Sequence, residues 1–348
     1  MNLVHDVSCS REALGEQLRA RLRSKAKPVG SLGRLEEIAV QIGMIAGSLA
    51  PDLGAARILV FAGDHGITAE GVTSYPSAVT REIAKLILAG TAGVNVLARA
   101  AGVGVTLVDA GMLQPLPGHP LLIDRRIGGG TKNSRREPAM SDEECTAAIE
   151  AGWAIDARIG GDNVGIVGFG EIGIGNTSAA ALVAHVLSGI ELRSLVGSGA
   201  GVPVLGLDHK YRVLSETIAR APIGALDSPA RAFDALRQFG GFEIAMMAGA
   251  MTAAAAAGRV ILVDGFISTT AAIAAGALSP ATLDNCIFAH SSAEAGHAVL
   301  LRHLGVRPLL ELEMRLGEGT GAALAVPLVR AAELMLCEMA DLPGEHPV

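Results

Sequence analysis

Short, uninterrupted apolar runs alternate with helical segments along this chain, and this alternation constrains the fold more than any other feature. Each run is closed by glycine, aspartate or histidine. Strands without polar alternation are typical of a parallel sheet whose two faces are both covered by helices. The sequence therefore predicts an α/β protein with a Rossmann-like, six-stranded parallel sheet. The predicted strands are residues 57–62, 103–108, 164–167, 195–196, 260–263 and 286–289.

Helical patterns fill the intervals between these strands and occupy both ends of the chain. The N-terminal part reads as two helices that are broken at residues 27–34. We expect residues 1–50 and 322–348 to pack together as a small helical lobe. Residues 51–321 would then form a large α/β domain that carries the functional site.

Composition limits the kinds of partner that the protein can have. Half of the 348 residues are hydrophobic, but only 3% are aromatic, so the core must consist of small and branched aliphatic side chains. The net charge is −7 and no segment is strongly basic, which disfavours nucleic-acid binding. Mean hydropathy is high at +0.43. The longest uncharged stretches, Ile172–Ile190 and Gly265–Leu283, are rich in small and hydroxyl residues, so we interpret them as buried helices and not as membrane spans.

The termini and cysteines indicate a cytoplasmic protein. Residues 1–23 are charged and contain no apolar core of the kind found in secretory signals. The four cysteines lie far apart in the sequence and form neither a metal-binding spacing nor a disulfide framework, so reduced thiols are expected. These cysteines are Cys9, Cys145, Cys286 and Cys337.

Residues 315–322 hold one carboxylate, Glu318, among three glycines. Glycine allows backbone conformations closed to other residues and lets a ligand approach closely. Arg315 indicates that an anionic ligand lies nearby. The alternative interpretation is a plain helix N-terminus, in which Thr320 caps the apolar run that follows. The stretch alone leaves both open.

Residues 168–178 form the densest glycine cluster of the chain. They contain a literal G-x-G-x-x-G after a strand, and Glu191 follows at the spacing of a dinucleotide-binding fingerprint, which would suit an NAD-dependent oxidoreductase. However, the cluster lies near mid-chain, and Glu171 inside it would repel a pyrophosphate. A second interpretation is that residues 176–178 begin a helix whose free N–H groups bind a single phosphate. A purely structural turn is the third.

Other polar clusters follow other predicted strands, where ligands of parallel sheets bind. Residues 197–201 repeat the glycine theme, and Lys210 beyond them could be a phosphate counter-ion or a solvated helix lysine. Asp64 and His65 could be an acid–base pair, but no ligand spacing supports a metal, so an orienting role for Asp64 is favoured. The segment that begins at His290 is open to the same two interpretations, a catalytic group or an orienting one.

Taken together, these segments resemble the nicotinate-nucleotide–dimethylbenzimidazole phosphoribosyltransferase family. The matching pieces cover nearly the whole chain, and as a set they are highly specific. They are KPVGSLGRLEE (27–37), FAGDHGI (61–67), GEIGIGNTSAAA (170–181), GGFEIAMMAGAM (240–251), VDGFIS (263–268), HSSAEAGH (290–297) and RLGEGTGAALA (315–325).

The resemblance implies transfer of the phosphoribosyl group of nicotinate mononucleotide to a benzimidazole nitrogen, as in assembly of the lower ligand of cobalamin. The products are an α-ribazole phosphate and nicotinate. By the match, Glu318 is the general base and Glu171 a second active-site carboxylate, and no metal or redox cofactor is expected. The residues that match nucleotide contacts are Gly173, Asn176, Thr177, Gly201, Lys210, Ser292, Arg315 and Gly317.

The acceptor side departs from the family pattern. Well-studied members hold the base with Ser and Gln, whereas Tyr75 and Ile83 stand at those positions here, with Ile172 as a further candidate contact. Adenine, other benzimidazoles or phenols are therefore possible acceptors. The family forms homodimers, and the same is expected here; pairing with a paralogue, as in some relatives, is the alternative. A non-catalytic nucleotide-binding subunit is a further alternative, which the presence of both carboxylates disfavours.

Overall fold

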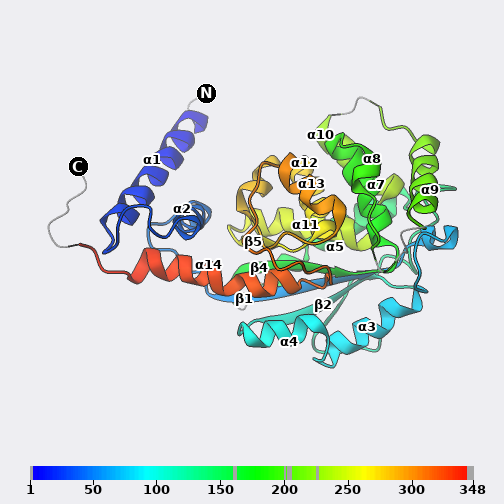
Figure 1. Ribbon diagram of the computed structural model, residues 1–348, viewed down its shortest axis with the longest axis horizontal. Helices are drawn as coiled ribbons and strands as arrows, with labels where there is room; N and C mark the ends of the chain where they lie inside the picture. Colours follow the sequence, from blue (N-terminus) through cyan, green and yellow to red (C-terminus); the bar gives the residue numbers. More distant parts are fainter. Residues whose placement is uncertain (1–2, 160–162, 200, 202–205, 225–226, 343–348) are drawn as a thin grey trace.

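The computed structural model of the protein describes residues 3–159, 163–199, 201, 206–224 and 227–342. Its centre is a six-stranded sheet in the order β3-β2-β1-β4-β5-β6, and every neighbouring pair is parallel (Figure 1). This confirms the predicted fold class. The strands are β1 (Ala55–Gly63), β2 (Gly104–Gly111), β3 (Leu122–Asp124), β4 (Val164–Ile172), β5 (Val260–Val263) and β6 (Cys286–Phe288).

The strand order reverses next to β1. The chain runs from β1 outward through β2 to β3, and then returns to place β4 on the other side of β1. Connections on the two sides of β1 therefore leave in opposite directions. A crevice opens at the carboxyl ends of two such strands, and ligands of open α/β sheets bind there. Phe61 of β1 lies beside Glu171 of β4 at this end.

Helices cover both faces of the sheet (Figure 1). Adjacent residues of β1 enter different cores: Leu59 and Phe61 lie in one, and Ile58 and Val60 in the other. Burial on both sides explains why the strands lack polar alternation. One face carries α5 (Asp142–Trp153), α7 (Asn176–Ser188), α10 (Ser228–Phe239), α11 (Phe242–Ala256) and α12 (Phe266–Leu278). The other carries α3 (Ala78–Leu88), α4 (Gly93–Ala100) and α14 (Thr320–Glu338).

The remaining elements are short or lie at the periphery. A capping box begins α5: the Glu144 amide donates to Ser141 Oγ at 3.1 Å, and the Glu144 carboxylate accepts from the Ser141 amide. The short or peripheral elements are α1 (Leu3–Ser24), α2 (Arg34–Ala46), η1 (Gly66–Glu70), α6 (Ile155–Ile159), α8 (Leu192–Leu195), α9 (Leu207–Arg220), η4 (Pro280–Asn285) and α13 (Ala295–His303).

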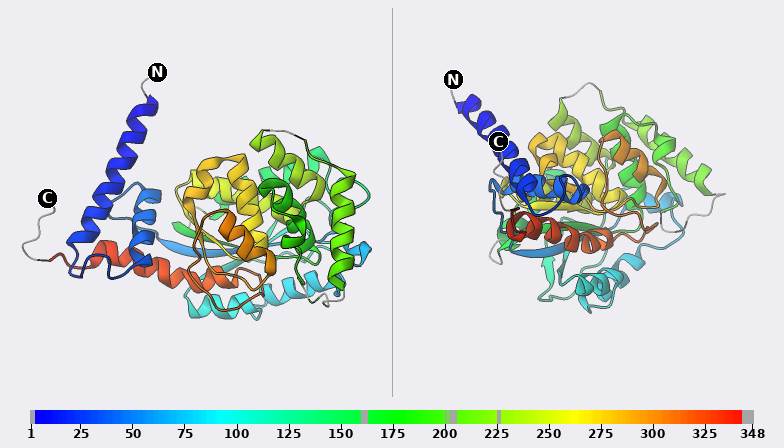
Figure 2. Two further views of the ribbon diagram at one scale, coloured as in Figure 1. Left: turned by 45° about the horizontal axis from the view of Figure 1, so that its top comes forward. Right: turned by 60° about the vertical axis from the view of Figure 1, so that its left-hand side comes forward.

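Helices from both ends of the chain lie together at one side of the molecule, where α1 and α2 stand beside the C-terminal part of α14 (Figures 1 and 2). Lys25 Nζ donates to the carbonyl of Met339 at 2.7 Å, which ties the two ends. The N-terminal part of α14 packs on the sheet instead, with Ala322 in the core. Because α14 contacts both parts, the division of the chain at residues 50 and 321 remains a prediction.

One predicted strand is wrong. Leu195 ends the short helix α8, and it packs against Gly296 of α13, where an added Cβ would lie 2.9 Å from the Leu195 carbonyl oxygen. The sheet gains its sixth strand from β3, in the region that has no regular pattern in the sequence. An edge strand of three half-exposed residues carries too little apolar signal to be recognised.

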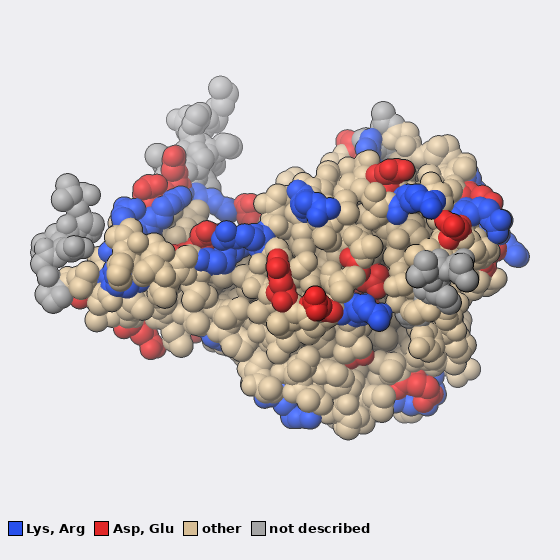
Figure 3. Space-filling view, in the orientation of Figure 1, with Lys and Arg blue, Asp and Glu red and all other residues tan. Residues whose placement is uncertain are grey.

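The two uncharged stretches form the buried helices α7 and α12, as predicted. Two other helical stretches, 78–100 and 320–338, are long and apolar enough to cross a membrane by length and composition. The first is divided between α3 and α4, and the second is α14, which packs on the sheet. On the face drawn in Figure 3, basic and acidic side chains are interspersed.

Candidate active site

A cavity of about 230 Å³ opens at the carboxyl edge of the sheet. Its walls come from the segments that follow β4, β5 and β6 and from the loop that precedes α14. Eight of the predicted site residues line it: Glu171, Ile172, Gly173, Asn176, Thr177, Ser292, Arg315 and Gly317. The structure thus brings together residues that are up to 146 positions apart, as the pair Glu171 and Gly317 illustrates.

The loop around Glu318 has an unusual backbone. Gly317, Glu318 and Gly319 have φ angles of 81°, 62° and 83°, all in the left-handed region. For a residue with a Cβ this conformation costs about 1–2 kcal/mol, so surrounding contacts must hold Glu318 in place. The Glu318 amide donates to the carbonyl of Glu171 at 3.1 Å. A Cβ on Gly170 would collide with the Gly319 backbone, so glycine in β4 makes room for this loop.

The Glu318 side chain is 5% exposed and lies against the start of α4. Its Oε2 accepts from the Val94 amide at 3.3 Å. Burial raises the pKa of Glu318, and the nearby Asp264 raises it further, although the Val94 hydrogen bond opposes the shift. A carboxylate with a raised pKa is a better proton acceptor than one in water.

Glu171 is the second buried carboxyl group. Asn176 Nδ2 donates to its Oε2. Burial raises the pKa of Glu171 to about 8, with contributions from Asp264, Glu243 and Glu318, against the Asn176 hydrogen bond. This shift favours the protonated form of Glu171 at neutral pH. The two carboxyl groups of the site thus lie in different environments.

Asp264 fixes the start of α14 through two backbone amides. Its Oδ2 accepts from the Gly319 amide at 3.2 Å and its Oδ1 from the Ala322 amide at 2.9 Å. Burial raises the pKa of Asp264 to about 7, opposed by these backbone hydrogen bonds. Thr320 does not cap α14, contrary to the plain-helix interpretation. It is the first helical residue, and its hydroxyl donates to the Gly317 carbonyl at 2.9 Å.

Two buried histidines lie at the cavity: His290 lines it, and His297 contacts the backbone of Ser292, which also lines it. His290 Nε2 lies 3.7 Å from Asp264 Oδ1, and its ring packs where a Cβ on Gly321 would otherwise lie. His297 Nδ1 accepts from the Ser292 amide at 2.9 Å, so its proton is on Nε2, which donates to Thr269 Oγ1 at 2.9 Å. Burial lowers the pKa of His297 to about 3, with a contribution from His290. His297 is therefore a neutral support for the Ser292 backbone.

Lys210 lies at the α7 end of the cavity and is 1% exposed, so it is not a solvated helix lysine. Its Nζ donates to Thr177 Oγ1 at 3.1 Å and to the Gly197 carbonyl at 2.9 Å. Burial lowers the pKa of Lys210 to about 8, and the charge of Glu294 opposes the shift. Lys210 therefore remains largely cationic at neutral pH. It contacts the cavity lining directly, through the hydroxyl of Thr177.

The other predicted nucleotide contacts differ in their positions. Gly173 is closely packed, since a Cβ there would meet the Gly63 carbonyl. Gly201 is exposed and lies outside the cavity, where its carbonyl accepts from Ser74 Oγ at 3.1 Å. Ala200, which belongs to the predicted glycine cluster, lies outside the described residues.

The predicted acceptor contacts do not form one group. Ile83 and Ile172 both pack against the core on the α3 and α4 face, which also contains Val94 next to Glu318. Tyr75 is 51% exposed and lies beside Gly201, where a Cβ would be 3.5 Å from its ring. Ile83 and Ile172 thus belong to the Glu318 side of the site, and Tyr75 to its rim.

Sequence reasoning missed several residues that line the cavity. Gly199 contacts Thr177 so closely that a Cβ would be 2.6 Å from its hydroxyl. Glu294 places a carboxylate near Lys210, and it lies within a segment that the sequence singled out. The full set of missed lining residues is Ile174, Gly199, Gly265, Phe266, Ile267, His290, Glu294 and Leu316.

Asp64 has the orienting role that its position favours. Its carboxylate accepts from Thr80 Oγ1 at 2.7 Å and from the Leu113 amide at 2.8 Å, so it joins the first turn of α3 to the segment that follows β2. His65 Nε2 lies 2.7 Å from Glu243 Oε1. Burial alone would lower the pKa of His65, but Glu243 holds it above its usual range. In the described part of the chain, no three His, Cys, Asp or Glu side chains group as metal ligands.

The fold and the site together describe an α/β protein with a small-molecule cavity at the carboxyl edge of its sheet. A family model described as phosphoribosyltransferase matches residues 7–344. The chain is 47% identical over 334 residues to the nicotinate-nucleotide–dimethylbenzimidazole phosphoribosyltransferase of Cupriavidus necator, and the match covers 96% of this chain and 95% of that protein. The enzyme of the same name from Ralstonia nicotianae is also 47% identical, with 96% and 94% covered.

Solved structures give the same result. CobT from Thermus thermophilus has a TM-score of 0.90 at 38% identity, and the match covers 94% of this chain and 97% of that one. The chain therefore belongs to the nicotinate-nucleotide–dimethylbenzimidazole phosphoribosyltransferase family.

The oxidoreductase alternative is not supported. The G-x-G-x-x-G stretch does not form a turn, because Gly168 and Gly170 lie inside β4. The room that Gly170 leaves is filled by the Gly319 backbone and is closed to a pyrophosphate. Glu191 precedes the short helix α8.

Proposed function

We propose that this protein transfers the phosphoribosyl group of nicotinate mononucleotide to 5,6-dimethylbenzimidazole or a related base. The products are α-ribazole 5′-phosphate and nicotinate. The buried pair Glu171 and Glu318, joined through a backbone hydrogen bond at the edge of a ligand cavity, carries this proposal. The relatives from Cupriavidus necator and Ralstonia nicotianae are named for the same activity.

Glu318 would act as the general base. One ring nitrogen of the acceptor attacks C1′ of the ribose with its lone pair, and the bond from C1′ to the nicotinate nitrogen breaks with its electron pair going to nicotinate. The other ring nitrogen loses its proton to Glu318. The raised pKa of Glu318, caused mainly by burial, favours this transfer. Its position on the α3 and α4 side supports an acceptor site that adjoins the nucleotide cavity at Ile172.

Glu171 would stabilise positive charge on the other side of the reacting carbon. The transition state resembles an oxocarbenium ion, and a nearby carboxylate lowers its energy. The pKa of Glu171 is raised to about 8, mainly by burial, in the empty site. The pyridinium ring of a bound nucleotide would favour the ionised form, so Glu171 would lose its proton when the substrate arrives.

The phosphate would bind at the end of the cavity where α7 begins. Thr177 lies in the first turn of α7, and the Lys210 ammonium group contacts its hydroxyl. Helix N–H groups and a buried cation are the usual partners of a single phosphate. Arg315, Ser292, Gly173, Asn176 and Gly317 would contact the rest of the nucleotide, and Gly201 would act from the rim.

The acceptor base would lie against Ile83 and Ile172, within reach of Glu318. These side chains offer apolar contact and no hydrogen bond, so shape and burial would select the base more than polar recognition. Tyr75 would act from the rim of the site. The acceptor could accordingly be a benzimidazole, a purine or a phenol.

The test of the proposed function is direct. The purified protein is incubated with nicotinate mononucleotide and a panel of bases, and products are identified by mass spectrometry. We expect nicotinate release that depends on a base, together with a ribosylated base phosphate. Absence of both products with every base would refute the proposal.

We also infer that the protein works in the cytoplasm as a homodimer. Cys145 and Cys286 are unpaired and buried, as in proteins of reducing compartments. The connection between α1 and α2 projects from the body and exposes the apolar side chains of Val29 and Leu32, at 69% and 36%. Such exposure suits a subunit interface. Sedimentation at micromolar concentration measures the oligomeric state, and a monomer would contradict the inference.

A further inference from the structure

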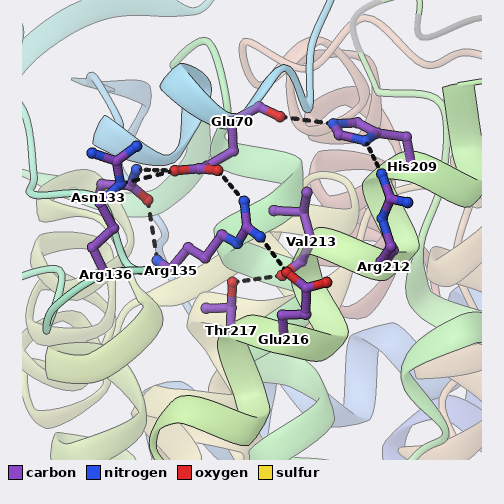
Figure 4. A network of polar contacts seen from close by, with 9 residues as sticks. All are labelled: Glu70, Asn133, Arg135, Arg136, His209, Arg212, Val213, Glu216 and Thr217. Carbon is purple, nitrogen blue, oxygen red and sulfur yellow. Dashed lines mark hydrogen bonds and ion pairs between the residues drawn. The ribbon is translucent and has the colours of Figure 1, made fainter.

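A buried carboxylate outside the cavity, Glu70, is the centre of a polar network (Figure 4). Glu70 ends η1, directly after the loop that follows β1, and its side chain is 7% exposed. It accepts from Asn133 Nδ2 at 2.6 Å, from Arg136 Nε at 3.2 Å and from Arg135 Nη1. These contacts, that of Arg135 first, lower the pKa of Glu70, so the network is built around a permanent negative charge.

The network also reaches α9 by two routes (Figure 4). Arg135 donates with its other terminal nitrogen, Nη2, to Glu216 of α9, so one guanidinium group joins two carboxylates. The second route runs through His209, whose Nε2 lies 2.8 Å from the Glu70 carbonyl oxygen. Arg212 can only donate to His209 Nδ1, at 3.1 Å, so the His209 proton is on Nε2 and is donated to Glu70.

The residue next to His209 is Lys210, the buried cation at the phosphate end of the cavity. Its ammonium group donates to Thr177 Oγ1 and to the Gly197 carbonyl. Helix α9 packs against α7 and α8. The contacts of Glu70 with Arg135 and His209 hold α9 from a second side, that of the segment after β1. Any rotation or shift of α9 would move the Lys210 ammonium relative to Thr177.

We propose that Glu70 is a positioning residue for the phosphate of the nucleotide, acting through Arg135, Glu216 and α9 on Lys210. This inference rests on the proposed function, because that function gives Lys210 its phosphate. Glu70 itself lies outside the cavity and touches no substrate. Its effect should therefore be on nucleotide affinity, with the chemical step and the acceptor site left unchanged.

The experiment compares wild type with Glu70→Gln and Glu216→Gln. Dissociation constants for nicotinate mononucleotide are measured by calorimetry, and kcat and both KM values by nicotinate release. We expect Glu70→Gln to weaken nucleotide affinity about five- to tenfold, with kcat and the KM of the base within twofold of wild type. Glu216→Gln removes only the link to α9 at a half-exposed side chain, so it keeps the test valid if Glu70→Gln fails to fold. It should weaken affinity about threefold.

A double-mutant cycle with Lys210→Ala separates positioning from general destabilisation. If Glu70 acts through Lys210, adding Glu70→Gln to Lys210→Ala should change nucleotide affinity less than twofold. Independent, multiplicative losses would overturn the inference, as would equal losses for nucleotide and base. The matched control is Glu137→Gln, which removes an exposed ion pair with Lys132, 3.6 Å long, on the same loop as Arg135. It should leave every constant within twofold.

The affinity measurement also separates this inference from the proposed function. Normal nucleotide binding by wild type without turnover on any base would refute the proposed function, and the affinity comparison would still decide the role of Glu70. Normal turnover with unchanged affinity in both Glu70→Gln and Glu216→Gln would overturn the positioning role alone.

Discussion

Glu318→Gln is the substitution that tests the active site most directly. Glutamine has the size of glutamate, and its side-chain oxygen can still accept from the Val94 amide, which lies 3.3 Å from Glu318 Oε2. Both residues have a Cβ, so the left-handed backbone at position 318 costs the same in each. The substitution therefore removes basicity and leaves the loop in place.

The size of the effect follows from the role. General-base catalysis contributes about a hundred- to ten-thousandfold, so turnover should fall by at least about a hundredfold. The nucleotide cavity does not include the Glu318 side chain, so affinity for nicotinate mononucleotide should stay within twofold. Activity then falls in kcat, with the KM of the nucleotide unchanged.

Stability should change in the opposite sense from activity. Burial raises the pKa of Glu318 above the ordinary value of 4.5, so ionisation of this group destabilises the folded state as pH rises above that value. Glutamine removes this penalty. The melting temperature of Glu318→Gln should therefore equal that of wild type at pH 4.5 and be equal or higher at pH 8.

The assay follows nicotinate release under saturating base, with calorimetric binding and thermal melts at both pH values. Near-normal turnover in Glu318→Gln would refute the catalytic assignment and move it to Glu171. A large fall in the melting temperature at pH 8 would show that the side chain holds the loop, and the kinetic loss could then not be assigned to basicity.

Three other variants test separate parts of the site. Lys210→Ala should raise the KM of nicotinate mononucleotide at least fivefold and that of the base less than twofold, and unchanged values would show that the phosphate assignment is wrong. Tyr75→Ser combined with Ile83→Gln should change the ranking of acceptor bases in a competition assay with little effect on nucleotide binding, and the same ranking would mean that the acceptor site lies elsewhere. Gly170→Ala should lower stability by about 1–3 kcal/mol and turnover at least tenfold, because its Cβ collides with the Gly319 backbone. Gly104→Ala, a strand glycine with open space around it, is the matched control for the melts, and equal melting temperatures for the two variants would contradict the packing argument.

The sheet could be predicted because its central strands are buried on both faces. Each of β1, β2, β4 and β5 carries a continuous apolar run, and that signal survives without tertiary information. The edge strand β3 is half exposed and pairs only with β2, so its three residues carry no such run. Leu195 misled the prediction because an apolar residue before a glycine reads equally well as a strand end or as a helix end.

The site could be predicted in its residues more than in its geometry. Glu318 and Glu171 both stand between glycines in short motifs, and such motifs are visible in sequence. The contact from Val94 to Glu318 joins residues 224 positions apart, so only the fold reveals that the carboxylate faces α4. Lys210 is a predicted contact, but its local sequence gives no sign that it is buried, because the burial results from the packing of α9 on α7.

The glycines of the site have a packing role beyond their backbone freedom. Gly170 gives the Gly319 backbone its place on β4, and a Cβ on Gly317 would lie 2.6 Å from Glu171 Oε1. The backbone of the Glu318 loop thus lies directly on Gly170, and the Glu171 carboxylate lies directly on Gly317. Any side chain at either glycine would push the two segments apart and open the hydrogen bond from the Glu318 amide to the Glu171 carbonyl. The close approach of the two segments that carry Glu171 and Glu318 therefore depends on the absence of two β-carbons.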